Sequence, residues 1–74
     1  MERNFNLVGK EIIGEDGCLC YKIELYLNMN KVEESEEIDN RGDFLIRLYE
    51  LNRDWYNKYL VDERFDNWKV NVNI

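Results

Sequence analysis

Histidine is absent from this 74-residue chain. Serine and cysteine nucleophiles commonly depend on a histidine base, and structural zinc sites combine cysteine with histidine. No glycine-rich phosphate loop is present either. The acidic residues fall in a polar stretch, whereas acid–base catalysis by paired carboxylates requires an enclosing pocket. We therefore expect a protein that is not an enzyme and that uses no cofactor.

Cysteine is scarce, with Cys18 and Cys20 as the two thiols. They lie two residues apart at an expected strand, a spacing too short for a comfortable disulfide. Tetrahedral zinc requires four ligands, so one chain offers too few thiolates for a metal site. We expect two ordinary free thiols and no metal. A dimer that pools four thiolates is the alternative that this spacing leaves open.

Proline and long apolar runs are also missing. No run is long enough to span a membrane, and the first six residues carry charges of both signs, unlike a signal peptide. Large side chains are nevertheless frequent, with 45% apolar residues and five Tyr, three Phe and two Trp. Disordered segments lack such a composition. We expect one folded domain, residues 1–74, in the cytoplasm.

Basic residues are outnumbered by acidic ones, 10 against 16, which gives a formal charge of −6. A negative field repels phosphate. Lys10, Lys22 and Lys69 form the one plausible basic patch, and three lysines are few. We expect direct contact with neither nucleic acid nor membrane. The alternative meaning of the charge is solubility.

Residues 5–28 have the sequence pattern of a β-hairpin. Apolar residues alternate with polar ones, and Glu15-Asp16-Gly17 suits a three-residue loop with Gly17 in the left-handed conformation. This loop would pair Ile13 with Leu19 and Phe5 with Leu27, so that the apolar residues share one face. Glu11 then falls opposite Tyr21, and it reaches solvent near an edge unless a bulge at Gly9 turns it outward.

An acidic segment, residues 29–42, and a long amphipathic segment, residues 43–60, follow the hairpin. Four glutamates in five positions repel one another along a helix, so we expect the acidic segment to be a mobile loop. Asp43 would then cap the helix. Its apolar arc of about 180° exceeds the stripe of about 100° that usually packs on a sheet. The margin of that arc consists of Leu45, Tyr49, Tyr56 and Leu60.

The last residues, 68–74, alternate as a strand with Trp68, Val70, Val72 and Ile74 on its apolar side. A charged connector, residues 61–66, separates them from the helix. The order ββαβ predicts an α+β fold: a three-stranded antiparallel sheet, order 2-1-3, packed on one face by a single long helix. A helical crossover would make the second and third strands parallel to each other.

The acidic segment and the surplus apolar margin of the helix together suggest a protein-binding surface. We expect Glu33, Glu34, Glu36, Glu37 and Asp39 to imitate phosphate charge and to dock on a basic protein surface, with Tyr49 and Tyr56 as anchors. The predicted function is a non-enzymatic inhibitor or decoy that occupies a basic, nucleic-acid-binding surface of its partner. The alternative is a small homo-oligomeric structural or regulatory domain, such as a homodimer, in which the acidic loop serves only solubility.

In size, charge and expected ββαβ pattern, the chain resembles the small acidic inhibitors encoded by phages and mobile elements. These include anti-CRISPR proteins, anti-restriction DNA mimics and toxin immunity proteins. The chain shares no motif with them, so the resemblance carries over no site residue.

Overall fold

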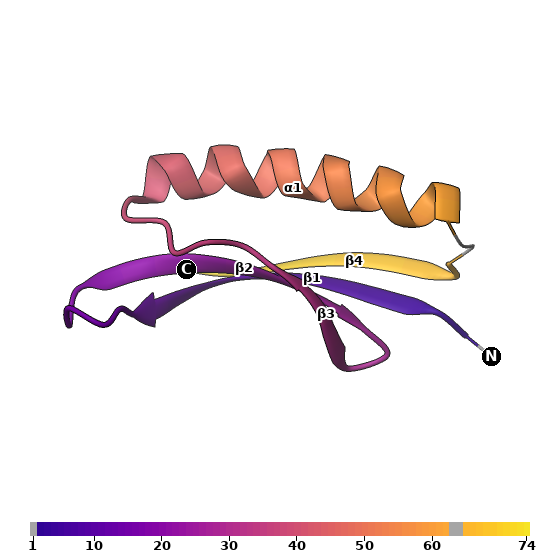
Figure 1. Cartoon of the computed structure of the whole chain (residues 1–74), viewed down its shortest axis with the longest axis horizontal. Helices are drawn as coiled ribbons and strands as arrows, with labels where there is room; N and C mark the ends of the chain where they lie inside the picture. Colours follow the sequence, from indigo (N-terminus) through magenta and orange to yellow (C-terminus); the bar gives the residue numbers. More distant parts are fainter. Residues whose placement is uncertain (1, 63–64) are drawn as a thin grey trace.

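A single helix lies across one face of a four-stranded sheet, which makes two layers (Figure 1). The computed structural model describes residues 2–62 and 65–74. The elements are β1 (Asn4–Ile13), β2 (Leu19–Leu27), β3 (Asn30–Glu34), α1 (Arg41–Asp62) and β4 (Asn67–Asn73). The α+β class expected from the sequence is confirmed.

The β1–β2 hairpin has the register that the alternation predicted. Ile13 pairs with Leu19, and Phe5 pairs with Leu27 at the other end. Gly17 has a φ of 80°, the left-handed conformation that glycine adopts without steric cost. Pairing is continuous through Gly9, and Glu11 opposite Tyr21 is exposed without a bulge.

The predicted three-stranded sheet is wrong in strand number, because the acidic segment contributes β3. A two-residue turn, Asn28-Met29, joins β2 to β3, and both residues have positive φ, 49° and 73°. Such a turn matches the twist of a hairpin, but it usually contains glycine. Met29 in this conformation is uncommon, so the sequence carries no turn signal here.

The presence of β3 also reverses the direction of β4 relative to the predicted sheet. Because β3 runs antiparallel to β2, the chain enters α1 from the opposite end of the sheet, and β4 runs parallel to β1. The expected all-antiparallel sheet is therefore wrong, and the observed sheet is mixed. Strand order is β3-β2-β1-β4, so β1 lies between β2 and β4.

The core lies between the sheet and the buried side of α1. Its fully buried large side chains are Phe5, Leu7, Ile23, Leu25 and Phe44. Gly9 allows the ring of Phe44 to rest directly on β1, since a Cβ at Gly9 would lie 2.6 Å from Cζ of Phe44.

Helix α1 begins earlier than residue 43, because Asn40 caps it. The backbone N–H of Asp43 donates to Oδ1 of Asn40 at 2.8 Å, and Nδ2 of Asn40 donates to the Asp43 carboxylate at 2.7 Å. The prediction that Asp43 is the cap is therefore wrong by one helical turn. At the other end, the helix includes residues 61–62 of the expected connector, and residues 63–64 of that connector lie outside the described residues.

Candidate functional site

The acidic segment is fixed against the sheet at two points. Ser35 is buried, its Oγ accepts the N–H of Ile23 at 2.9 Å, and its own N–H donates to the Ile23 carbonyl at 2.7 Å. Ile38, also buried, exchanges two backbone hydrogen bonds of 2.8 Å with Tyr21. The segment therefore follows a defined path from β3 to α1.

Three of the five predicted carboxylates form ion pairs within the chain. These pairs are Glu33 with Lys58 at 2.8 Å, Glu34 with Lys22 and Lys31 at 3.0 Å each, and Glu36 with Arg47 at 2.9 Å. The hydrogen bond from Arg47 lowers the pKa of the Glu36 carboxyl. Hydrogen bonds from Lys31 and Lys22 do the same to the pKa of Glu34. These side chains already have basic partners, which weakens their attraction for a second protein.

The remaining two carboxylates, Glu37 and Asp39, are exposed and meet Glu15 and Asp16 of the β1–β2 turn. We call these four residues the acidic end. They line a shallow hollow of about 250 Å³ together with Leu19 and neighbouring residues. Among the described residues, no base forms an ion pair with any of the four.

The negative charges of the acidic end affect the pKa of the neighbouring Cys20 thiol. Burial raises the pKa of its thiol, and the charges of Glu37, Asp16 and Asp39 raise it further. The thiol is therefore kept protonated and a poor nucleophile. The acidic end comes from two segments, the β1–β2 turn and the acidic segment. Nothing in the sequence indicated that these two segments would lie next to each other.

Tyr49 and Tyr56, the two predicted anchors, lie on the side of α1 that faces β4. Tyr56 packs edge-on against Phe65 and Trp68, with ring centroids 5.1 and 5.2 Å apart. Nε1 of Trp68 donates to Oδ1 of Asn52 at 2.8 Å, which ties the same side of the helix to β4. Tyr49 remains 71% exposed and Tyr56 37% exposed.

Other apolar side chains continue this surface onto the strand. Val70 and Val72 pair with Leu7 and Gly9, so they lie on the helix side of the sheet, yet they remain 45% and 42% exposed. We call the whole surface the apolar flank. Its members are Leu45, Tyr49, Tyr56, Val70, Val72 and Ile74.

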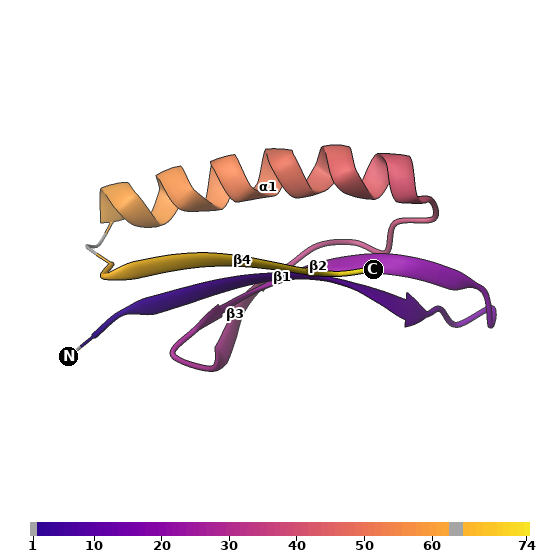
Figure 2. The same cartoon turned by 180° about the vertical axis from the view of Figure 1, so that it is seen from behind.

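The opposite side of α1 is charged. Arg47 and Lys58 reach Glu36 and Glu33 of the acidic segment there. One side of the helix is thus occupied by ion pairs. The other side faces β4, one of the two edge strands of the sheet, and Figure 2 shows the helix running above this strand.

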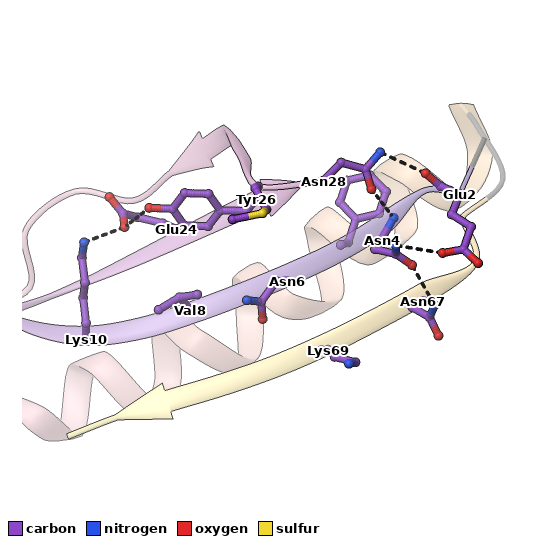
Figure 3. A pocket seen from close by; sticks show the side chains of 12 residues that line it. Glu2, Asn4, Asn6, Val8, Lys10, Glu24, Tyr26, Asn28, Asn67 and Lys69 are labelled. Carbon is purple, nitrogen blue, oxygen red and sulfur yellow. Dashed lines mark hydrogen bonds and ion pairs between the residues drawn. The ribbon is translucent and has the colours of Figure 1, made fainter.

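The sheet face away from α1 holds a polar network that sequence reasoning missed. Glu24 is buried there, 2.7 Å from Nζ of Lys10 and 3.4 Å from Nζ of Lys31, and it accepts the Tyr26 hydroxyl at 2.9 Å (Figure 3). Burial opposes ionisation, but the hydrogen bonds from Lys10, Tyr26 and Lys31 outweigh it and lower the pKa of Glu24. The alternation along β2 had already put Glu24 on the polar side.

Asparagine pairs continue this network across β1 and β4. Nδ2 of Asn67 donates to Oδ1 of Asn4 at 2.7 Å, and Asn71 donates to Asn6 in the same way. A hollow of about 680 Å³ is lined by part of this face, including Lys10 and Lys69 (Figure 3). Two of the three lysines that were considered too few for a basic patch have acidic partners, because Glu24 and Glu34 pair with Lys10 and Lys22.

The cysteines are free, Cys18 exposed and Cys20 buried. Within residues 2–62 and 65–74, no three His, Cys, Asp or Glu side chains group as a metal site would require. No helix in the described part of the chain has the length and apolar character to cross a bilayer. Comparisons with protein-family models, curated proteins and solved structures found no match.

Proposed function

We propose that this protein is a non-enzymatic inhibitor or decoy that binds a basic surface of another protein through its acidic end. One observation carries the proposal: four carboxylates from two segments surround a hollow, and none has a basic partner in the described chain. A Lys/Arg-rich surface supplies the missing charge. A surface that normally binds nucleic acid has this character, because it is built to neutralise phosphates.

Charge and apolar contact have separate parts in this proposal. Opposite charges mainly accelerate association and select the partner, whereas apolar anchors supply most of the affinity. Leu19 lines the hollow and is 50% exposed, so it is the anchor nearest to the carboxylates. The acidic end is open to solvent and lacks the enclosing pocket that acid–base catalysis by carboxylates requires. Binding, rather than a reaction, is the activity that this surface suits.

The proposal is tested by neutralising the acidic end. Partners are captured on the tagged protein from cells that produce it, identified, and assayed for nucleic-acid binding with and without the protein. The variant Glu15→Gln/Glu37→Gln/Asp39→Asn should no longer capture a basic, nucleic-acid-binding partner. It should also no longer inhibit the binding of nucleic acid by that partner. Asp16 is left in place because its carboxylate accepts the backbone N–H of Cys18.

A matched control removes the same charge elsewhere. Glu2→Gln/Glu11→Gln/Glu50→Gln changes three exposed or half-exposed carboxylates outside the acidic end. This control should retain the partner. Equal loss of the partner by both triple variants would contradict the proposal, since only net charge would then matter. Full retention by both would also contradict it, since the acidic end would then contribute nothing.

A homo-oligomeric structural or regulatory domain is the second candidate function. The apolar flank favours it, because monomeric proteins rarely expose contiguous apolar surface of this kind beside an open strand edge. The two candidates use different surfaces of the molecule.

A further inference from the structure

We infer that a second copy of this chain pairs with β4, antiparallel across a two-fold axis at Asn71, and that the two copies form one eight-stranded sheet. The inference is independent of the inhibitor proposal, because it concerns the apolar flank and the edge of β4 rather than the acidic end. It rests on the second candidate function, the homo-oligomeric domain, and specifies its interface.

The two edges of the sheet differ in how well they are protected. At one edge, β3 has five residues, an irregularity opposite Leu25 and Tyr26, and charged side chains. Short length, bulges and charges are the usual devices that keep sheet edges from pairing. At the other edge, β4 has seven residues, pairs with β1 in regular register, and contains one charged residue, Lys69. Its outer edge is a template for another strand.

The sequence of β4 is suited to pairing with itself. In an antiparallel pair, residues opposite each other lie on the same face of the sheet. A two-fold axis through one residue therefore opposes the residue before it in one copy to the residue after it in the other copy, and both side chains point to the same face. With the axis at Asn71, Val70 lies opposite the second copy's Val72, and Lys69 opposite its Asn73. Apolar side chains then meet on the helix side, amides meet on the other face, and the two lysines stay apart.

The apolar flank supplies the rest of the contact. In this arrangement both helices lie on the same face of the joined sheet, and their exposed sides, with Leu45, Tyr49 and Tyr56, face each other across the two β4 strands. A stable interface buries about 800 Å² per partner, which is about a sixth of the 5124 Å² exposed by one chain. A second copy supplies both a matching strand and a matching apolar flank, as two-fold interfaces require.

Sedimentation of the purified chain tests the inference. The parent should sediment at twice its 9.1 kDa mass. Val72→Lys puts a charge in the paired edge and should give a monomer that still melts cooperatively. Val32→Lys is the matched control: Val32 lies in β3 at the opposite edge and is 37% exposed, close to the 42% of Val72. A monomeric parent, or a Val72→Lys protein that remains dimeric, would overturn the inference.

Disulfide trapping tests the register. In a Cys18→Ser background, Asn71→Cys should oxidise to a covalent dimer, because directly opposed antiparallel residues lie within disulfide reach. Asn73→Cys, which faces Lys69 of the second copy, should not cross-link. Cross-linking at 73 but not at 71, or at neither, would refute pairing about Asn71.

Discussion

Glu24 is a carboxylate almost removed from solvent, at 5% exposure, on the face of the sheet away from α1. A buried ion is costly unless hydrogen bonds compensate it. Lys10, Lys31 and the Tyr26 hydroxyl provide that compensation. The hydrogen bond to Glu24, followed by burial, raises the pKa of the Tyr26 hydroxyl. Ionised Glu24 therefore stabilises the fold and keeps the lysines of this face in place.

Replacing Glu24 should change how stability depends on pH. The folded-state pKa is below the ordinary value of 4.5, so its stabilisation is complete above 4.5 and is lost as pH falls through the lower folded value. Glu24→Gln should reduce the free energy of unfolding by about 1–3 kcal/mol at pH 7. Urea unfolding at a series of pH values measures this.

The control is Glu11→Gln, since Glu11 is an exposed residue of β1. It should cost little stability at pH 7, because the side chain is exposed to solvent. An equal loss of stability for Glu24→Gln at pH 7 and well below pH 4 would show that ionisation of Glu24 contributes nothing.

Strand β3 is the element that could not be predicted from the sequence. The β1–β2 register could be predicted because strict alternation and Gly17 both specify it. The glutamates of β3 and its continuation discouraged a strand, since three of the four bases that pair with them, Lys22, Arg47 and Lys58, come from other elements, and only Lys31 belongs to β3 itself. No local pattern contains that information. The reversed direction of β4 follows from the same omission.

The start of α1 also differs from the sequence prediction, because Asn40 rather than Asp43 caps the helix. Asn40→Ala should lower stability by about 1 kcal/mol, because an N-cap side chain satisfies a backbone N–H that has no partner within the helix. Asn40→Asp should restore most of the loss. Thermal melting followed by circular dichroism measures both.

A mid-helix substitution provides the comparison. Asn57 is exposed in α1, and Asn57→Ala should be neutral or slightly stabilising, because alanine is the better helix former. If Asn40→Ala and Asn57→Ala melted at the same temperature, Asn40 would not be the cap.

Charge is distributed unevenly over the whole molecule. In the described part of the chain, no base forms an ion pair with the acidic end, the side of α1 that faces the acidic segment holds ion pairs, and the six residues that define the apolar flank are all uncharged. Sequence reasoning found the helix residues of the flank, because Tyr49 and Tyr56 fall outside the stripe that a sheet can cover. It placed Val70, Val72 and Ile74 on the inward side of the last strand, whereas the structure leaves all three exposed. It did not find the acidic end, because the meeting of Glu15 with Glu37 depends on the backbone pairing of Tyr21 with Ile38.

The two proposed interactions should respond to salt in opposite ways. Each chain carries −6, so two copies repel, and screening should strengthen self-association through the apolar flank. Binding of a basic partner at the acidic end should weaken as salt rises. Sedimentation of the parent and titration of its captured partner, both from 50 to 500 mM NaCl, measure the two trends. A common trend would mean that the two interactions are not carried by these separate surfaces.

The parallel pairing of β1 with β4 has a consequence for the kinetics of folding. Every paired residue in that ladder is separated by 63 positions in the chain, as in Asn4 with Asn67. Closing so long a loop costs entropy before any contact compensates it, and such topologies fold slowly. The β1–β2 hairpin can form locally, whereas β4 joins only after β3 and α1 are in place. Strand β4 is thus the element expected to dock last during folding of a single chain, and in the Val72→Lys monomer its amides should exchange with solvent before those of the central hairpin.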